Sequence, residues 1–531
     1  MKHILRNSFW QLMIIYTAII LLVAFGFLSK YSLQFNLLAI AIGLIGAFFL
    51  SNKGEFKEEI KINKKLHYIL LGVSLLLILI IRVIPYFSTS IPLGYDVGLY
   101  KYGIEYGLQN TDLWILQGGM EPGFLYLMQP FSLLLSTDFI LKYLLIGFCI
   151  LLGLGVYFVS KEYFNKTTAL ISVFIYALSL IQFRTFWYMY YKNIIGMSTM
   201  LFSFYFLKKY ESNQKNIYKW LFIIFGGVTG AIHRPTFYLF GLSYFIYAFV
   251  SPYSNKKYSK KILLNNILSG VSILIIAGLF YLGDFFQAIT SILPGVAGGF
   301  IDPGQSPGTF INLFTYQYSI LPYLALAILG LVFCIKRKIG ILEIWATLNL
   351  AIVYFQFFFF NRFIIMLDLA LILFASYGFY LLIENKKKAG VIITIILLLS
   401  LGIFAVKDSL NSTSLINNNE LSIIQYLQNT PNESFVMSTS SYYSPWILGY
   451  SERKTIAPGL FNDDEHNKLD WEKFWTTTNI SEIKQFLSSY NRPLYIFIGE
   501  KQKNNLAQFN ETGCFEIYTQ DNGNFIYKYL C

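Results

Sequence analysis

The stretch that decides the fold is residues 88–136, which begins STSIPLGYDVGLYKYGIEYG (88–107) and ends GGMEPGFLYLMQPFSLLL (118–135). It is the first long interruption in a series of apolar segments. It contains the carboxylates Asp96, Glu105, Asp112 and Glu121. The side of the membrane on which this stretch lies therefore determines both the architecture of the chain and the location of its chemistry.

The composition indicates an integral membrane protein. Of the 531 residues, 55% are hydrophobic and 13% are charged, whereas a soluble domain has about 25% charged residues. The net charge of +12 comes from Lys and Arg in short loops, where they encode membrane topology and do not indicate nucleic-acid binding. Residues 1–30 contain an apolar run long enough to span a bilayer and no small-residue cleavage site, so we expect an uncleaved helix and not a signal peptide.

Apolar runs of about 16–22 residues, the length that crosses a bilayer as a helix, recur along the chain. They predict an α-helical polytopic membrane protein with about 13 transmembrane helices, followed by a small external α/β domain. The predicted spans are 8–28, 32–50, 67–87, 138–159, 168–183, 191–207, 218–232, 235–251, 263–282, 313–334, 341–360, 363–383 and 390–406.

Basic loops fix the orientation of these spans, because Lys and Arg are enriched in cytoplasmic loops. The basic loops are 52–66, 208–219, 252–262, 336–338 and 386–388. Placing all of them inside puts the N-terminus in the cytoplasm. Residues 88–136, 283–310 and everything after 406 are then extracellular or periplasmic.

Residues 120–135 are apolar enough to be counted as another span. Counting them would break the agreement among the basic loops, and the segment contains Glu121, Pro122 and Pro130. We therefore expect a helix that lies at the outer membrane interface or dips into it, without crossing.

Three regions follow from this topology. Residues 1–66 form a two-helix preamble with a basic cytoplasmic loop, and residues 67–406 form a transmembrane domain that includes the external stretch 88–136. Residues 407–531 form an external domain in which helix and strand patterns alternate, which favours a small α/β fold. The predicted helices there are 417–430 and 480–490, and the predicted strands are 434–440 and 493–500.

The last residues predict a β-hairpin, because Asn522-Gly523 is the strongest short hairpin signal. Counting outward equally on both strands places Cys514 opposite Cys531, at a position where side chains lie close together. In an oxidising exterior these two residues can form a disulfide. Two free thiols are the alternative.

Charges at membrane depth are costly and indicate function. The cytoplasmic loops hold abundant Lys, whereas the outer ends of the predicted spans hold a few isolated charges, which points to a site on the outer face. These charged or titratable residues are Asp96, Glu105, Glu121, Arg184, Lys192, His233, Arg234, Asp284, Asp302 and Arg362.

The carboxylates of the external stretch have both structural and catalytic interpretations. Asp96 follows an early helix and can cap a helix over 97–109, or act as a functional carboxylate. Glu105 lies four residues after Lys101 and can pair with it on a helix face. Asp112 can serve as a cap or in a turn.

Glu121 stands at the start of the predicted interfacial helix. An acidic residue in a first turn suits the helix dipole. Gly118, Gly119 and Gly123, on either side of it, would also allow another part of the chain or a ligand to approach closely, which favours a functional role.

His233 and Arg234 follow a segment of about 15 residues, which spans roughly 22 Å as a helix, less than the hydrocarbon thickness of about 30 Å. They should therefore lie below the outer surface. A guanidinium there matches the oxygens of a lipid phosphate, and an internal pair with Asp96 or Glu121 is the alternative. Arg362, in FFFFNRF (357–363), has the same two interpretations.

Arg184 and Lys192 flank the aromatic segment FWYMYY (186–191). They are candidates for binding the phosphate of a lipid. Anchoring of the aromatic patch at the membrane interface is the alternative.

The chain resembles the GT-C superfamily of membrane glycosyltransferases. The resemblance rests on an aspartate soon after an early helix, in a first external loop of two juxtamembrane helices, and on many spans with an external C-terminal domain. YLQNTPNESFVMSTSSYYSPWILGYSERKTIAPG (426–459) is similar to the start of such domains in prokaryotic members. The family's aspartate matches Asp96, and a second acidic residue of the family matches Glu121.

The resemblance implies a polyprenyl-phosphate-linked sugar donor used on the outer face, with a glycan, a lipid or a protein as the acceptor. Asp96 would accept the proton of the attacking hydroxyl as general base, and one displacement would invert the anomeric carbon. Arg234, His233 and Arg362 would stabilise the departing lipid phosphate. The sequence has no HExxH, DxD or Cys/His cluster that requires a metal, although a divalent ion is compatible with the chemistry.

Two other functions fit parts of the sequence. The segment EPGF (121–124) with a downstream His-Arg resembles polysaccharide polymerases or ligases of the EpsG and Wzy type, which usually lack so large an external domain. A lipid-linked-sugar flippase or other transporter should show paired broken helices in repeated halves. One short Gly-rich segment is present without a matching partner. The absence of a Walker loop gives no support to ATP-driven transport.

Overall fold

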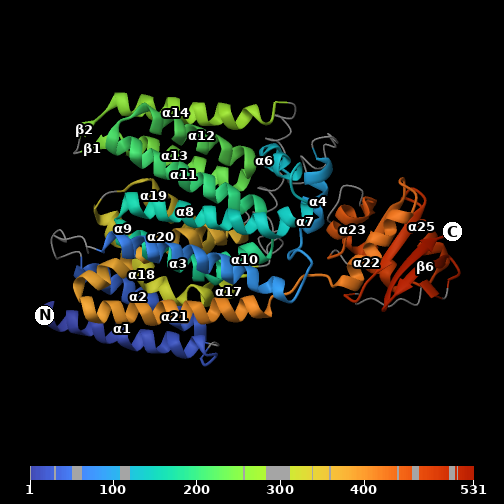
Figure 1. Ribbon diagram of the computed structural model, residues 1–531, viewed down its shortest axis with the longest axis horizontal. Helices are drawn as coiled ribbons and strands as arrows, with labels where there is room; N and C mark the ends of the chain where they lie inside the picture. The colour runs from blue at the N-terminus through green and yellow to red at the C-terminus, as the bar shows by residue number, and fades with distance from the viewer. Residues whose placement is uncertain are drawn as a thin grey trace. The chain divides into compact units, whose positions relative to one another are not determined.

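The computed structural model of the protein consists of a helical bundle and a smaller part that contains a β-sheet (Figure 1). The described residues are 2–28, 31–50, 62–107, 120–254, 257–282, 311–337, 339–357, 360–438, 442–456, 466–501, 509–510 and 512–531.

The chain divides into two compact units, and each unit is built from segments that are not consecutive in the sequence. Unit 1 consists of Met1–Pro85, Glu121–Phe124 and Leu145–Ser412, and unit 2 consists of Tyr86–Met120, Leu125–Leu144 and Thr413–Cys531. The predicted boundary near 407 lies close to the start of the last part of unit 2. Most of the stretch 88–136 is part of unit 2.

Every predicted apolar span contains helix, because an apolar backbone segment satisfies its hydrogen bonds internally in this form. The helices lie side by side in Figure 1. Their bounds are α1 (Lys2–Ala24), α2 (Ser32–Leu50), α3 (Lys64–Val83), α8 (Leu145–Tyr163), α9 (Lys166–Leu178), α10 (Leu180–Trp187), α11 (Tyr191–Asn213), α12 (Asn216–Ile232), α13 (Arg234–Val250), α14 (Lys260–Leu279), α17 (Leu313–Ser319), α18 (Leu321–Arg337), α19 (Ile341–Tyr354), α20 (Phe360–Asn385) and α21 (Lys387–Asn411).

Not all of these helices are both long enough and apolar enough to cross a membrane. Among the described residues, 5 helices are long and apolar enough, or up to 7 if each of two bent pairs counts as one span. The protein is therefore a helical polytopic protein. The higher count of spans stays a prediction, because several of the apolar helices, such as α12 and α19, are short.

The two bent pairs were not expected from the sequence. The pair α9 and α10 is bent by 51°, and the pair α17 and α18 by 80°. The first break occurs at Ser179, whose side chain accepts a hydrogen bond from the backbone N–H of Gln182 and so starts a new helix. Helix α20 packs against α9, α18, α19 and α21 and is the buried centre of unit 1.

Short elements complete the described chain. A hairpin of β1 (Tyr253–Ser254) and β2 (Lys257–Tyr258) joins α13 to α14. The external stretch has helices at both predicted places, α4 and α6. The bounds of the short elements are η2 (Ile84–Phe87), α4 (Val97–Tyr106), α6 (Pro122–Ser132), α7 (Thr137–Phe139) and η3 (Ile140–Leu144).

The C-terminal part of unit 2 is a mixed α/β fold, as predicted. The sheet order is β4-β3-β5-β7-β6, with β3 parallel to β4 and β5 and with β7 antiparallel to β5 and β6. The strands are β3 (Phe435–Ser438), β4 (Lys454–Ile456), β5 (Leu494–Ile498), β6 (Phe515–Asp521) and β7 (Asn524–Tyr529), and the helices are α22 (Asn418–Tyr426), η5 (Leu427–Asn429), α23 (Ser444–Ser451), α24 (Lys468–Thr476) and α25 (Ile480–Leu487).

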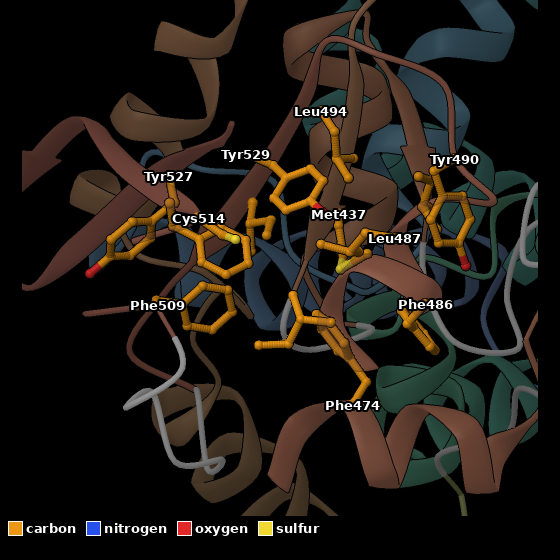
Figure 2. Packing of buried hydrophobic residues seen from close by; sticks show 14 of the residues in the cluster. Met437, Phe474, Phe486, Leu487, Tyr490, Leu494, Phe509, Cys514, Tyr527 and Tyr529 are labelled. Carbon is orange, nitrogen blue, oxygen red and sulfur yellow. The ribbon is translucent and has the colours of Figure 1, made fainter. Parts of the chain in front are cut away.

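An aromatic core holds this sheet to its helices. Figure 2 shows Met437, Leu487 and Leu494 packed together, with Phe474 and Phe486 beside them. The strands β3 and β5 are buried throughout, which explains their continuous apolar sequences. Strand β4 and helices α23 and α24 were not predicted, because their segments are short and lack a clear period.

The predicted hairpin is present, but its register differs from the expected one. Asp521 pairs with Asn524 as counted, whereas a β-bulge between Ile517 and Thr519 shifts the outer pairs by one residue. An extra residue on one strand causes such a shift. The prediction that Cys514 lies directly opposite Cys531 is therefore wrong by one residue. The two sulfur atoms are nevertheless joined in a disulfide, with the Cα atoms 5.1 Å apart.

Candidate functional site

Predicted site residues from distant parts of unit 1 gather at the starts of helices. Glu121 precedes α6, Lys192 lies in the first turn of α11, His233 and Arg234 join α12 to α13, and Arg362 lies in the first turn of α20. We call this group the Glu121 cluster.

The start of α6 comes very close to the end of α12, and Gly123 makes this possible. A Cβ atom at this position would lie 2.5 Å from the Cβ of Ala231 and 2.7 Å from its carbonyl oxygen. Such distances would displace the backbone. The close approach that the sequence suggested around Glu121 is thus a contact between two helices of the same chain, and it carries Glu121 to the α12–α13 junction.

Glu121 is buried, with 2% of its surface exposed, and both of its carboxylate oxygens contact cations. The Nζ atom of Lys192 donates to Oε2 at 2.6 Å. The Nε atom of Arg234 lies 3.7 Å from Oε1, and the backbone N–H of Arg234 donates to the same oxygen at 3.3 Å. The sequence left two kinds of partner open for Arg234, a lipid phosphate and an internal carboxylate. The structure shows that the carboxylate of Glu121 is one of its partners.

These contacts keep Glu121 ionised. Burial alone would raise the pKa of Glu121, but the charges of Lys192 and Arg234 and the hydrogen bond from Lys192 outweigh burial and lower the pKa below its usual value. A carboxylate in this state is a poor proton acceptor at neutral pH, because its proton affinity is reduced.

His233 is buried and neutral. Burial, together with the charges of Lys192, Arg362 and Arg234, lowers the pKa of His233 to about 3, although the charge of Glu121 opposes this shift. Its Nδ1 atom accepts from the backbone N–H of Thr236 at 3.3 Å, which caps α13 and places the proton on Nε2. The charge of Arg362 thus acts within the cluster, which holds three cationic side chains and one carboxylate.

Arg184 has a different partner. Its Nε and Nη2 atoms donate to the two carboxylate oxygens of Asp408, each at 2.9 Å. This bidentate pair joins the end of α10 to α21 and occupies one edge of the guanidinium. The sequence analysis did not predict Asp408 as a partner of Arg184, although Asp408 lies just beyond the last predicted span.

Asp96 lies in unit 2 at the N-cap position of α4. It accepts the backbone N–H of Tyr100 through its main-chain oxygen, but its side chain does not cap the described helix. The capping interpretation of the carboxylate is therefore not supported. The predicted pair of Lys101 with Glu105 is present and half-buried.

Some residues and one loop that were singled out from the sequence lie in parts of the chain that the structure does not describe. Asp112, Gly118, Gly119, Asp284, Asp302 and the predicted external loop 283–310 lie outside the described residues.

Two tyrosines near the cluster were missed. Tyr238 of α13 and Tyr281, beyond the end of α14, are both within electrostatic range of Glu121 and Arg234. The hydroxyl of Tyr281 donates to the carbonyl oxygen of Gly230 at 3.0 Å. With 40 tyrosines in the chain, no sequence signal distinguished these two.

Within the described ranges, no three His, Cys, Asp or Glu side chains lie close enough together to hold a metal ion. The polar groups of the Glu121 cluster are mainly cationic, and cations do not ligate metals.

Comparison with known proteins gives one family match. Residues 122–281 match the family described as dolichyl-phosphate-mannose-protein mannosyltransferase. The matched segment starts next to Glu121 and includes Lys192, His233 and Arg234. No curated protein sequence matches the chain at a significant level.

Solved structures share the fold over most of the chain. The archaeal oligosaccharyltransferase AglB from Archaeoglobus fulgidus, in complex with an inhibitory peptide and a dolichol-phosphate, has a TM-score of 0.57 and 15% identity, covering 82% of this chain and 69% of that chain. An oligosaccharyltransferase from Archaeoglobus fulgidus in the apo form has a TM-score of 0.60 and 14% identity, covering 82% of this chain and 70% of that chain. ArnT from Cupriavidus metallidurans bound to undecaprenyl phosphate has a TM-score of 0.57 and 10% identity, covering 88% and 98%.

Proposed function

We propose that this membrane glycosyltransferase of the GT-C superfamily moves a sugar from a polyprenyl-phosphate-linked donor to a hydroxyl acceptor on the outer face of the membrane. The predicted resemblance to the superfamily and the predicted enzyme class are confirmed by the family match and the shared fold. The donor class is supported by the dolichol-phosphate and undecaprenyl phosphate bound to two proteins of similar fold.

The observation that carries this proposal is the Glu121 cluster. Lys192 and Arg234 contact the buried carboxylate of Glu121, and Arg362, from a third helix, lies within electrostatic range of the neighbouring His233. A phosphate that departs from the anomeric carbon gains negative charge, and preorganised cations stabilise that charge as it develops. These cationic side chains lie at the starts of helices, where free backbone N–H groups also point toward a bound anion. Both features favour binding of a phosphate.

In the proposed reaction the acceptor oxygen attacks the anomeric carbon of the donor. A bond forms between that oxygen and the anomeric carbon, while the bond from the anomeric carbon to the phosphate oxygen breaks. Asp96 takes the proton of the acceptor hydroxyl, and the electron pair of the broken bond leaves with the polyprenyl phosphate. A single displacement inverts the anomeric configuration.

Glu121 has a positioning role in this scheme. Its lowered pKa makes it unsuited to proton transfer, and its two oxygens hold Lys192 and Arg234 in place. We therefore assign proton transfer to Asp96 alone, and His233 supports the cluster as a neutral helix cap.

The variant Asp96→Asn tests this assignment. Removal of a general base typically lowers the rate by about 10²–10⁴-fold, so transfer in proteoliposomes with a lipid-linked donor should fall by that amount with normal expression. Glu105→Gln is the matched control, because it neutralises a carboxylate of the same helix that is paired with Lys101. Full activity of Asp96→Asn would refute the mechanism.

A second candidate function is movement of the lipid-linked sugar across the membrane. Two broken helices converge on the buried Asp368 of α20: its Oδ2 atom accepts from Ser179 at 2.9 Å and from Gln182 at 2.8 Å, and Tyr323 at the start of α18 donates to Oδ1. Broken helices around a buried polar group are typical of transporters. A scrambling assay without acceptor decides: movement of donor between leaflets supports transport, and acceptor-dependent sugar release alone supports transfer.

A further inference from the structure

We propose that a cavity at the far ends of the unit 1 helices, away from the Glu121 cluster, binds the phosphate-bearing head group of an anionic membrane phospholipid. The cavity has a volume of about 1070 Å³ and is lined by residues from α11, α13, α14, α18, α19 and α20. We call it the inner cavity. The proposal is independent of the transfer reaction.

The inner cavity lies one membrane thickness from the Glu121 cluster. Helix α13 starts with Arg234 and lines the cavity with Tyr247 and Val250, and helix α20 carries Arg362 at its start and Tyr380 at the cavity. The 18 residues from 362 to 380 span about 27 Å as a helix, close to the hydrocarbon thickness of about 30 Å. The cavity therefore opens at the opposite membrane interface.

Three cationic side chains line the cavity, each from a different basic segment of the sequence. They are Lys208 at the end of α11, Lys261 at the start of α14 and Arg337 at the end of α18. The three segments are among those that the positive-inside rule assigns to the cytoplasm. Basic pockets between transmembrane helices on that side suit anionic lipid head groups.

The two carboxylates of the cavity are already engaged. Glu211 accepts the hydroxyl of Tyr247 and lies 3.4 Å from Lys208. Glu343 accepts the backbone N–H of Gly340 at 2.9 Å, as the capping box of α19 requires. Their positions are therefore set by the protein's own donors, and the described lining residues include three cationic side chains against these two carboxylates.

The cavity has an apolar edge that suits acyl chains. Val250 and Ile262 line it and are also exposed on α13 and α14. On the same helices Phe245 is 61% exposed and Leu264 is 59% exposed, so the apolar surface continues along both helices. A soluble anion would not use this surface, whereas a phospholipid would cover it.

Exposed tyrosines mark the depth of the cavity in the membrane. Tyr253, which lines the cavity, is 68% exposed, and its ring contacts that of Tyr258 on the neighbouring strand at 5.0 Å between centroids. Tyrosines with one polar and one apolar end concentrate at the level of lipid head groups. A head group can therefore reach Lys261 and Arg337 while its chains stay in the bilayer.

The experiment uses the full chain in detergent micelles doped with dioleoylphosphatidylglycerol, dioleoylphosphatidylcholine or inorganic phosphate. Thermal midpoints and lipid adducts in native mass spectra are measured. We expect phosphatidylglycerol to raise the midpoint more than phosphatidylcholine does. The variant Lys208→Gln/Arg337→Gln should raise the apparent dissociation constant for phosphatidylglycerol by about tenfold or more, because each cation near the surface contributes to anionic-lipid binding.

The matched control is Lys215→Gln/Lys388→Gln. It removes the same charge from two exposed lysines that do not line the cavity, one in the same basic segment as Lys208 and one in segment 386–388, and it should bind phosphatidylglycerol as the parent chain does. The proposal fails if both double variants lose the lipid equally, if the two lipids stabilise the parent chain equally, or if inorganic phosphate alone gives the full effect. If the cavity variant does not fold, the comparison of the two lipids on the parent chain still decides.

Discussion

The carboxylate of Glu121 is committed to cations through both of its oxygens, and this limits what it can do in a reaction. Its partners lie 71 and 113 residues away in the sequence. A buried ion pair of this kind is strongly destabilised when one partner is removed, because the opposite charge stays in the interior. Glu121 is therefore better understood as the residue that organises the cations.

The variant Glu121→Gln should lower the free energy of unfolding by about 3 kcal/mol or more, because the buried anion that Lys192 and Arg234 contact is lost. Unfolding of the detergent-solubilised protein measures the change. Glu105→Gln breaks a half-buried helical pair with Lys101 and should cost less than about 1 kcal/mol. Equal losses in the two variants would show that the Glu121 pairs are not energetically distinct.

The variant Arg362→Ala should impair donor use more than acceptor use, because a guanidinium near the lipid phosphate mainly stabilises that group. We expect the KM for the lipid-linked donor to rise about tenfold for one lost charge-assisted contact, with the KM for the acceptor unchanged. Arg184→Ala is the comparison, since Asp408 already binds two nitrogens of its guanidinium. A change in acceptor kinetics alone would contradict the placement of the phosphate.

At the scale of elements, α4 owes its position in unit 2 to its contact with α23. A Cβ on Gly98 would lie 1.8 Å from the carbonyl oxygen of Pro445, and a Cβ on Gly449 would lie 2.2 Å from the carbonyl oxygen of Gly98. Two glycines thus let the backbones touch. Because Gly98 is two residues after Asp96, the sheet-bearing part of unit 2 fixes the place of the proposed base.

The variant Gly98→Ala should push α4 away from α23 and move Asp96. A displacement of about 1 Å can lower a rate by up to 10²-fold, so we expect kcat to fall at least about tenfold with the donor KM retained. Gly72→Ala in α3 is the control, because its Cβ would meet nothing within 4 Å. Steady-state kinetics of the two variants decide, and an unchanged kcat for Gly98→Ala would show that the contact does not position the base.

Local sequence predicted most elements and missed those that depend on neighbours. Runs of apolar residues identified the helices, and Asn522-Gly523 identified the hairpin. The breaks at Ser179 and before Leu321 were missed, because the apolar pattern continues through them and each is stabilised by contacts with α20. The bulge in β6 was missed for the same reason, since pairing with β7 defines it.

At the scale of the whole molecule, the division into units cuts across the chain. The external stretch joins the C-terminal residues in unit 2, while Glu121–Phe124 stay with the helices of unit 1. The short segment that carries Glu121 is therefore part of the helical unit, whereas Asp96 belongs to unit 2.

The variant Cys514→Ser/Cys531→Ser should destabilise the sheet of unit 2. The disulfide closes a loop with a sequence separation of 17, and a loop of that length is worth about 3 kcal/mol by the chain-entropy model. Strand signals should melt earlier, with helical signals of unit 1 retained. Reductant should shift the parent chain in the same way and leave the double variant unchanged; alkylation of both cysteines under non-reducing conditions would contradict the bond.

The sequence by itself determined the membrane character, the helical segments, the hairpin with its two cysteines and the set of isolated charges from which the site is built. These features are local: hydropathy, loop charge and turn chemistry act over a few residues. The tertiary structure decided that Lys192 and Arg234 meet at Glu121, that Arg184 pairs with Asp408, and that Gly98, two residues after Asp96, packs against α23. Those contacts depend on which helices pack together, and close packing at Gly123 and Gly98 is determined by shape between segments distant in sequence, which no local pattern encodes.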